Sequence, residues 1–379
     1  MKIAVNTRLL IPGKLEGIGW FSCETLRRIC MQHPEHEFIF IFDREYDDQF
    51  LFAPNVKPLI LSPKARHPIL YYIWFEIRLP ALLNKIKPDL FFSPDGYLPL
   101  SYKGPCLTVF HDLNFEHYPE DLPFAERKFY RHFFPKFARK ADRIATVSEF
   151  SKQDIQRQYH IEASKIDVVY NGVNEAYQQI DPDEQEKTRE RYAQSCPYFL
   201  FVGSLHPRKN LARLFQAYDR FRKENAGNVK LLIIGARKWW TPPIQQAYDA
   251  MQFKQDVLFA GRLTVNDLSK VMGSALALTY ISYFEGFGIP LLEAFASHTP
   301  VITANVTSLP EIAGEAALLT DPFSVESIAN AMASIASDKD LRKSLVEKGN
   351  LRVKDFSWER SASLLYESMM KTIESPINS

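Results

Sequence analysis

Short hydrophobic runs alternate with longer amphipathic stretches along most of the chain. In the first half, runs such as KIAVNT, EFIFIFD, DLFFSPDG and CLTVFHD are apolar at consecutive rather than alternate positions. Consecutive apolar positions are typical of strands buried on both faces, as in parallel sheets that helices cover on both sides. The pattern therefore predicts an α/β fold of the doubly wound, Rossmann-like kind.

A polar stretch at residues 174–197 interrupts this pattern once, and it resembles a linker that carries one charged helix. The pattern then restarts with YFLFVGS, VKLLIIG, VLFAGR, ALALTYIS and PVITANV. We therefore predict two Rossmann-like domains, residues 1–175 and residues 190–357. A final amphipathic stretch at 358–379 predicts one more helix, with Ser357 as its N-cap.

Composition fits this division and excludes several functions. A chain of 379 residues is long enough for two cores, and its 46 Lys and Arg nearly balance its 45 Asp and Glu. No overall positive field favours nucleic acid as a partner. The start of the chain has no secretory signal pattern, and no run of about 18 apolar residues could span a bilayer. We expect a cytoplasmic protein.

Two stretches that follow predicted strands carry candidate chemistry, because doubly wound domains bind ligands at the carboxyl ends of their strands. In YFEGFGIPLLEAFA, Gly286 and Gly288 allow a sharp turn into a helix, whose start favours an anion. The segment also places Glu285 and Glu293 on either side of that turn. An ordinary tight turn is the alternative.

The second stretch, VGSLHPRKN, places Arg208 and Lys209 behind Gly203, as a diphosphate site requires. A solvated surface pair is the alternative. In the first half, Gly17 and Gly19 of LEGIGWFS form a loop that could approach a ligand, but Ser22 stands where a dinucleotide fingerprint has its third glycine. A nicotinamide-dependent oxidoreductase is therefore a weaker alternative.

His111 ends the buried run CLTVFHD, where it could bond a ligand hydroxyl, carry a proton or serve the core alone. The four cysteines lie far apart, and HPEH at residues 33–36 has only loose metal-ligand spacing, so we favour a turn there and expect no metal site. The aromatic stretch at 69–88 and the basic aromatic stretch at 126–143 could contact an anionic membrane, or form core and solvated faces.

Taken together, these segments resemble the family 4 retaining glycosyltransferases of the GT-B fold (glycosyl transferases group 1), mannosyltransferase-like members above all. The resemblance covers nearly the whole chain. It rests on EGIGWFS, HDLNFEHYPE, ADRIATVSEFSKQDI, VVYNGV, FVGSLHPRKNLARLFQAY, FAGRLTVNDL, YFEGFGIPLLEAFASHTPVITANVTSLPEIAG and FSWERSA, in the family's order. The family's two glutamates with seven residues between them match Glu285 and Glu293.

The resemblance implies two domains facing across a cleft, with the last helix crossing back to the first domain. It implies catalytic roles for His111, Glu285, Arg208 and Lys209. The implied donor-binding residues are Gly17, Gly19, Gly203, Ser204, Arg262, Leu263, Phe287, Gly288, Ile289 and Glu293.

The implied activity is metal-independent, retaining transfer of a hexose from a nucleotide-diphosphate sugar, with GDP-mannose favoured. The acceptor would be a glycan or a lipid-linked glycan in polysaccharide biosynthesis, and the enzyme would lie in the cytoplasm, with the inner face of the membrane as a second place. A nucleotide-sugar-binding protein without catalysis is the non-enzyme alternative.

Overall fold

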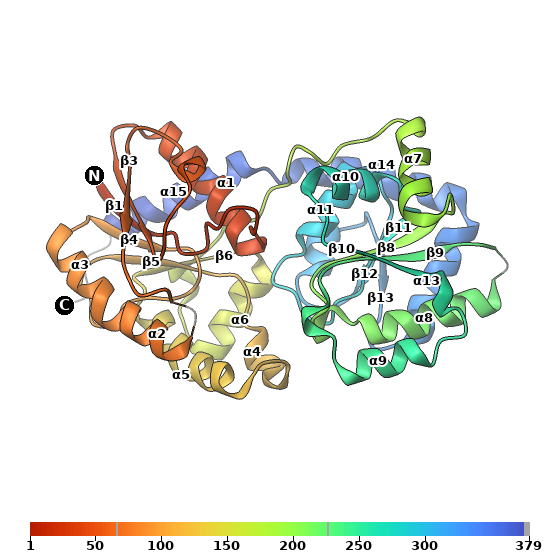
Figure 1. Cartoon of the computed structure of the whole chain (residues 1–379). Coiled ribbons are helices and arrows are strands. Elements are labelled where there is room, and N and C mark those ends of the chain that lie inside the picture. Colours follow the sequence, from red (N-terminus) through yellow and green to blue (C-terminus); the bar gives the residue numbers. More distant parts are fainter. Residues whose placement is uncertain (66, 226, 375–379) are drawn as a thin grey trace. The chain divides into compact units, whose positions relative to one another are not determined.

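The computed structural model describes residues 1–65, 67–225 and 227–374, and they form two compact units (Figure 1). The first unit contains Met1–Asn171 and residues 357–374, and the second contains Gly172–Phe356. The chain thus leaves the first unit after Asn171 and returns to it at Ser357.

Among the described residues, the first unit holds seven parallel strands in the order β3-β2-β1-β4-β5-β6-β7. Ile3 of β1 faces Phe38 on one side and Leu90 on the other, so the strand order reverses between β1 and β4. The strands are β1 (Lys2–Asn6), β2 (Glu37–Phe42), β3 (Val56–Ile60), β4 (Leu90–Ser93), β5 (Cys106–Phe110), β6 (Arg143–Thr146) and β7 (Ile166–Val168).

Helices cover both sides of this sheet, with α1 and α15 on one side and α2, α3, α5 and α6 on the other (Figure 1). The helices are α1 (Gly17–Gln32), α2 (Pro68–Tyr72), the π-helix η2 (Ile73–Arg78), α3 (Leu79–Ile86), α4 (Asn114–His117), α5 (Phe124–Lys140), α6 (Glu149–Tyr159) and α15 (Trp358–Glu374). Ser148 caps α6 by accepting a hydrogen bond from the Ser151 amide at 3.0 Å.

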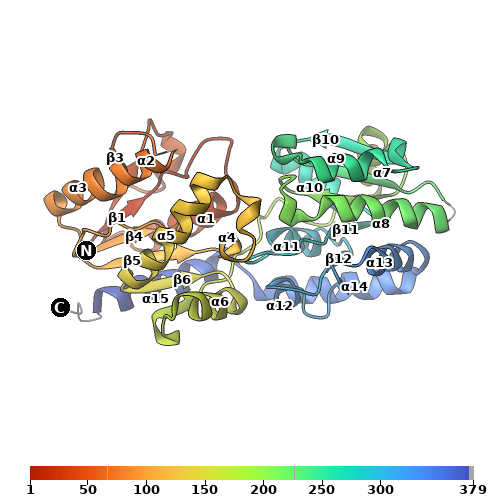
Figure 2. The same cartoon turned by 90° about the horizontal axis from the view of Figure 1, so that it is seen from below.

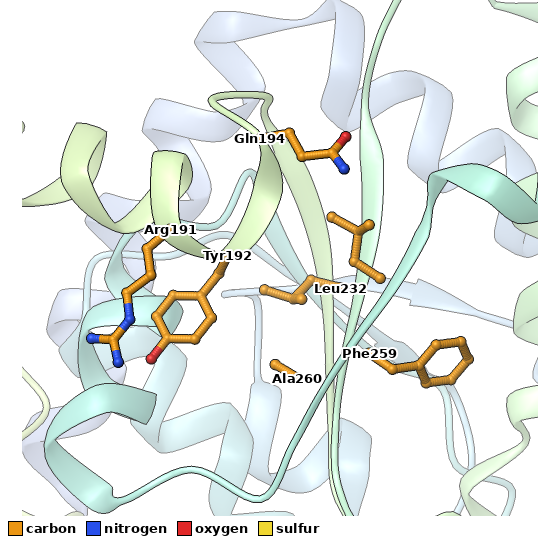
Figure 3. Close-up of a pocket in the computed structure, with 7 residues that line it drawn as sticks. Arg191, Tyr192, Gln194, Leu232, Phe259 and Ala260 are labelled. Atoms are coloured by element: carbon orange, nitrogen blue, oxygen red, sulfur yellow. The ribbon is translucent and has the colours of Figure 1, made fainter.

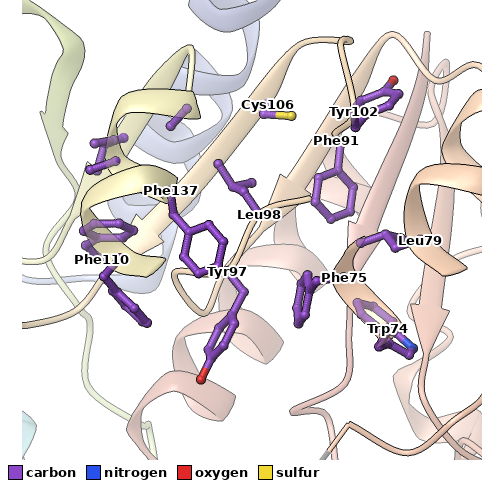
Figure 4. Close-up of a cluster of buried hydrophobic side chains, with 14 of the residues drawn as sticks. Trp74, Phe75, Leu79, Phe91, Tyr97, Leu98, Tyr102, Cys106, Phe110 and Phe137 are labelled. Atoms are coloured by element: carbon purple, nitrogen blue, oxygen red, sulfur yellow. The ribbon is translucent and has the colours of Figure 1, made fainter. Parts of the chain in front are cut away.

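An aromatic core lies between the strands and the α3 and α5 side of the sheet (Figure 4). Trp74, Phe91, Phe110 and Phe137 are each almost completely buried there. The Trp74 indole also donates a hydrogen bond to the Leu61 carbonyl at 2.7 Å, so its polar atom is satisfied inside the core.

The described part of the second unit holds six parallel strands in the order β10-β9-β8-β11-β12-β13, which reverses between β8 and β11. The strands are β8 (Tyr198–Val202), β9 (Lys230–Ile234), β10 (Val257–Gly261), β11 (Ala277–Tyr280), β12 (Val301–Ala304) and β13 (Leu318–Thr320). The doubly wound fold predicted from the hydrophobic runs is confirmed in both units.

The helices of the second unit also form two groups. Figure 1 shows α7, α10, α11 and α14 on one side of the strands and α8 and α9 on the other, and Figure 2 is seen from the side of the second group. These helices are α7 (Pro182–Ala193), α8 (Leu211–Glu224), α9 (Pro242–Asp249), α10 (Val265–Gly273), α11 (Ile289–Ala296), α12 (Leu309–Ala313), α13 (Val325–Ser337) and α14 (Lys339–Arg352).

A close backbone approach fixes the loop that follows β8. Gly235, directly after β9, has φ +156°, and a Cβ atom there would lie 1.9 Å from the Gly203 carbonyl oxygen. Its amide donates to the Gly261 carbonyl at 2.9 Å, so it joins the ends of three neighbouring strands. A side chain at this position would push the loop after β8 away.

We expect Gly235→Ala to lower the free energy of unfolding by about 3 kcal/mol, because overpacking adds to backbone strain. Gly227→Ala is the matched control, since Gly227 has φ +139° but nothing within 4 Å of its added Cβ. Urea unfolding followed by circular dichroism measures both. Equal losses in the two variants would contradict the close approach.

Candidate functional site

The loop between β8 and α8 is held by its own side chains. His206 starts the 3-10 helix η5 (Pro207–Lys209), and its Nδ1 accepts a hydrogen bond from the Arg208 amide at 3.3 Å. Asn210, in the left-handed conformation at φ 63°, donates from its side chain to the carbonyls of Ile281 and Pro322 at 3.1 and 2.6 Å. These bonds fix the positions from which Arg208 and Lys209 extend.

Glu285 bridges the two basic residues. Arg208 donates to Glu285 Oε2 at 2.6 Å and to the Phe284 carbonyl at 3.1 Å. Lys209 donates to Glu285 Oε1 at 2.6 Å and to the Tyr280 hydroxyl at 2.5 Å, with its Nζ 4.6 Å from the centre of the Tyr280 ring. The structure therefore brings together three of the predicted site residues, and neither basic residue is a solvated surface side chain.

Burial and charge act in opposite directions on Glu285, which is 5% exposed. Burial raises the pKa of its carboxyl, but the Arg208 and Lys209 cations outweigh burial and hold that pKa at about 2. The carboxylate is therefore ionised at any working pH. One negative and two positive charges leave the group with a net charge of about +1.

The turn after β11 presents backbone amides beside this group. Ser308 donates from its hydroxyl to the carbonyls of Glu285 and Phe287 at 3.0 and 3.1 Å, which fixes the turn. Gly288 adopts φ 104°, and a Cβ atom there would lie 2.8 Å from a Leu309 methyl carbon. Among the described residues, no carbonyl or side chain accepts a hydrogen bond from the Gly288 or Ile289 amide at the start of α11. The predicted anion-binding turn has the geometry that an anion needs.

Glu293 lies one turn further along α11 and is half-buried. Burial raises its pKa to about 7, although its interaction with the Tyr177 hydroxyl opposes this shift. The two glutamates therefore differ sharply: Glu285 is ionised throughout, whereas Glu293 changes its charge near neutral pH. Only an ionised carboxylate accepts hydrogen bonds at both oxygens without donating one.

Other predicted residues of the second unit lie at the same edge of the sheet but outside this group. Ser204 is exposed after β8, and Arg262 and Leu263 follow the edge strand β10, where Arg262 is exposed and Leu263 half-buried. Within the described residues, no hydrogen bond or ion pair joins Arg262 to Glu285. A role for Ser204, Arg262 and Leu263 in nucleotide binding stays a prediction.

In the first unit, the prediction that Gly17 and Gly19 lie in a loop is wrong. Helix α1 begins at Gly17, so both glycines belong to its first turn, after Glu16 in an extended N-cap conformation. Gly19 is buried, and an added Cβ would lie 3.1 Å from a Leu15 methyl carbon, whereas Gly17 is exposed with nothing within 4 Å. Packing therefore explains the glycine at 19 but not the one at 17.

His111 follows β5 and is held through one ring nitrogen. Its Nε2 lies 2.9 Å from the Pro94 carbonyl, which can only accept, so Nε2 carries a hydrogen. Burial lowers the pKa of His111, and the ring is therefore neutral with a lone pair on Nδ1. The Phe21 and His111 rings pack edge to face with their centres 5.1 Å apart, and this contact restrains the orientation of the imidazole. His111 is suited to accept a hydrogen bond from a hydroxyl.

Sequence reasoning missed several residues that complete these sites. Tyr280 ends β11, the strand that precedes the glycine turn, and Ser308 is the N-cap of the short helix α12 and bonds to two carbonyls of that turn. In the first unit, Arg8 follows β1 and pairs with Asp95 after β4 at 2.6 Å, with its guanidinium 4.6 Å from the Tyr97 ring centre. Their position in the sequence could have indicated these residues. All of them except Ser308 end or follow a strand at a reversal of strand order, where doubly wound sheets bind ligands.

A cavity of about 360 Å³ lies elsewhere in the second unit, between α7 and strands β9 and β10 (Figure 3). Its walls come from Arg191, Tyr192, Gln194, Leu232, Leu258, Phe259 and Ala260. None of the predicted site residues lines it.

Comparison with known proteins identifies the family. Residues 183–352 match the family described as glycosyl transferases group 1, and residues 31–177 match glycosyltransferase family 4. The two matches fall on the two sheets and together cover most of the chain. The chain belongs to the family 4, group 1 glycosyltransferases.

Curated relatives of this glycosyltransferase match most of its length. O-antigen chain mannosyltransferase B of Escherichia coli is 28% identical over 370 residues, covering 95% of this chain and 97% of the relative. O-antigen chain mannosyltransferase RfbU of Salmonella typhimurium is 27% identical, covering 77% and 78%. The solved structure of Anabaena HepE with UDP and glucose is 17% identical, covers 98% of this chain and 100% of that one, and has a TM-score of 0.75. The structural likeness places the glycosyltransferase in the GT-B fold.

The pKa of Glu293 predicts how the stability of the glycosyltransferase depends on pH. The folded pKa of about 7 lies above the ordinary value of ~4.3, so the folded state binds the proton more tightly than the unfolded state. The stabilisation is complete below about pH 4 and is lost as pH rises through 7. Relative to Glu293→Gln, the wild type should lose about 2 kcal/mol of unfolding free energy between pH 5 and 7.5.

Urea midpoints of the two proteins across this range measure the difference. Glu285→Gln is the comparison variant, because its carboxyl does not titrate in this window. A constant difference between the wild type and Glu293→Gln at every pH would mean that Glu293 titrates normally.

Proposed function

We propose that this glycosyltransferase is a retaining, metal-independent hexosyltransferase that uses a nucleotide-diphosphate sugar, with the diphosphate bound by Arg208, Lys209 and the start of α11. The observation that carries the proposal is the Glu285 bridge, which holds both cations at the turn that leads into α11 through Gly288 and Ile289. The group keeps a net positive charge, so it attracts a dianion even before Glu285 moves.

The chemistry requires charge stabilisation at the leaving group. When the bond between sugar and phosphate breaks, negative charge develops on the diphosphate and the sugar becomes positively charged. The loop and the turn already hold Arg208, Lys209 and the amides of Gly288 and Ile289 at one site, so they stabilise this charge once Glu285 yields its hydrogen bonds to the diphosphate. In this proposal they replace the divalent metal that other sites use, and no cofactor is required.

Glu285 is a poor candidate for the nucleophile of a double displacement. Both of its oxygens accept hydrogen bonds from cations, and its pKa of about 2 marks a weakly basic carboxylate. We therefore propose retention by attack of the acceptor on the face that the diphosphate leaves, with Glu285 facing the sugar. His111 accepts a hydrogen bond from a sugar hydroxyl through Nδ1, and Glu293 accepts from the ribose hydroxyls.

The donor and acceptor proposals rest on the relatives. Because two relatives, matched over 95% and 77% of this chain, are named O-antigen mannosyltransferases, we propose GDP-mannose as donor and a glycan or lipid-linked glycan as acceptor. Family membership removes the oxidoreductase alternative, and the fingerprint that suggested it is the first turn of α1. Gly17, Gly19, Gly203, Ser204, Arg262, Leu263 and Phe287 complete the proposed donor contacts.

Two substitutions separate binding of the diphosphate from transfer. Arg208→Ala removes a charged donor, and GDP affinity should fall about 10- to 100-fold, as for other hydrogen bonds to charged groups. Glu285→Gln leaves both cations without their internal anion, so GDP affinity should stay equal or rise, while GDP release from GDP-mannose with acceptor falls at least ~100-fold. Calorimetric titration in EDTA measures the first quantity and turnover measures the second.

Arg220→Ala is the matched control, because Arg220 lies on α8, the helix that follows the loop carrying Arg208, and among the described residues it pairs with the surface glutamates Glu224 and Glu326. Parallel loss of GDP affinity in Glu285→Gln and Arg208→Ala would show that Glu285 has no separate role. GDP binding that vanishes in EDTA would overturn metal independence.

We also propose a peripheral contact between the first unit and an anionic membrane. Ile69, Tyr72 and Ile77 of α2 and η2 are 64, 50 and 55% exposed, and Phe124 at the start of the adjacent α5 is 61% exposed. The Lys128 ammonium lies 4.5 Å from the Phe124 ring centre. Exposed apolar side chains beside cations suit binding to the surface of a membrane with acidic lipid headgroups. Among the described residues, no helix is long and apolar enough to cross a bilayer.

Sedimentation with phosphatidylglycerol vesicles tests this contact. The wild type should bind these vesicles and not phosphatidylcholine vesicles, and Ile69→Ser with Phe124→Ser should reduce binding at least ~10-fold. Leu351→Ser, at an equally exposed position of the second unit, should leave it unchanged. Equal binding to phosphatidylglycerol and phosphatidylcholine vesicles, or no binding to either, would contradict the proposal.

A further inference from the structure

Two histidines and a glutamate gather in the turn between α1 and β2. His33 is the C-cap of α1 and donates its amide to the Ile29 carbonyl at 3.0 Å, and the His36 amide donates to the His33 carbonyl at 3.2 Å. These backbone bonds close the turn and fix where the three side chains start. The sequence alone favoured an ordinary turn here, because spacing in HPEH says little about where the side chains lie.

The ligand atoms of these residues already lie close to a coordination geometry. Glu35 Oε1 is 3.2 Å from His33 Nδ1 and 3.5 Å from His36 Nε2, and all three atoms lie within 4.8 Å of one another. With bonds of about 2.0 to 2.2 Å, ligands of a tetrahedral zinc ion are ~3.3 Å apart. Two of the three separations match, and the third is no more than 4.8 Å.

Tyr366 of helix α15 holds the two imidazoles in place. Its ring stacks on His33 and His36 with centres 3.5 and 5.9 Å apart, which positions both imidazoles. Its hydroxyl lies 2.8 Å from His36 Nε2, and a metal on that nitrogen would replace this hydrogen bond. Helix α15 packs along α1, and the half-buried Tyr366 and His33 meet in this contact. Ligands whose rings are fixed by neighbours lose little freedom when a metal binds.

We propose that His33, Glu35 and His36 bind a divalent transition metal of the zinc class, which ties the turn to the last helix. Two imidazole nitrogens and one carboxylate suit zinc, nickel or copper and disfavour magnesium and calcium, which prefer oxygen ligands. The Tyr366 hydroxyl oxygen or a water molecule supplies the fourth ligand.

The position of the site makes it structural rather than catalytic. The turn leads into β2 at Glu37, so it lies at the amino ends of the strands, whereas ligand sites of doubly wound sheets lie at the carboxyl ends. Glu285, Arg208 and Lys209 belong to the other unit. The proposal is therefore independent of the donor site, and metal-independent transfer is compatible with it.

Zinc titration of the full-length chain, without an affinity tag and after treatment with EDTA, tests the proposal. Competition with a chromogenic chelator should show one zinc site of micromolar or tighter affinity, and zinc should raise the melting temperature. Glu35→Gln keeps the shape of a side chain that is 57% exposed, and it should weaken zinc binding at least ~10-fold and remove most of the rise in melting temperature. His33→Ala should behave in the same way.

His132→Ala is the matched control, since His132 lies exposed on α5 far along the chain from the turn, and it should bind zinc as the wild type does. Zinc affinity that is unchanged in both Glu35→Gln and His33→Ala would overturn the proposal. So would a wild type without a saturable site below about 100 μM, which corresponds to only weak binding.

Discussion

The buried contact of Glu285 with Arg208 and Lys209 is the constraint on which the rest of the candidate site depends. Two cations taken from water need an anion or solvent nearby, and a carboxylate that bridges both is stable only where each partner is held in place. The chain meets this condition with a loop after β8 and a turn after β11, adjacent strands at the reversal of strand order. The same contact joins the loop to the turn and keeps the cations poised for an anion.

Several features outside the ion group support that arrangement. The Asn210 side chain bonds to the Ile281 carbonyl, Gly235 lets the chain after β9 approach the Gly203 carbonyl, and Ser308 bonds to two carbonyls of the glycine turn. Each feature is a buried polar bond or close backbone contact that limits movement. In the proposed function, a site held in this way would stabilise charge on a leaving group, and this stabilisation would be the main source of catalysis.

The sequence predicted both sheets because strands buried on two faces are apolar at consecutive positions. It also predicted that the candidate residues follow strands, since Arg208 comes after β8 and Glu285 after β11. It could not predict that Glu285 bridges both cations, because that contact joins residues 76 and 77 positions apart. The pKa near 7 of Glu293 arises from burial beside Tyr177, which depends on tertiary packing. Gly17 was misplaced because glycine favours loops locally, whereas Glu16 in extended conformation starts a helix there.

A crystal structure of the chain with GDP, grown in EDTA, tests the central claim most directly. The account predicts that the diphosphate oxygens lie within hydrogen-bonding distance, about 3 Å, of Arg208, Lys209 and the Gly288 and Ile289 amides, with no metal between them. A diphosphate bound elsewhere, with the Glu285 bridge to both cations unchanged, would contradict it.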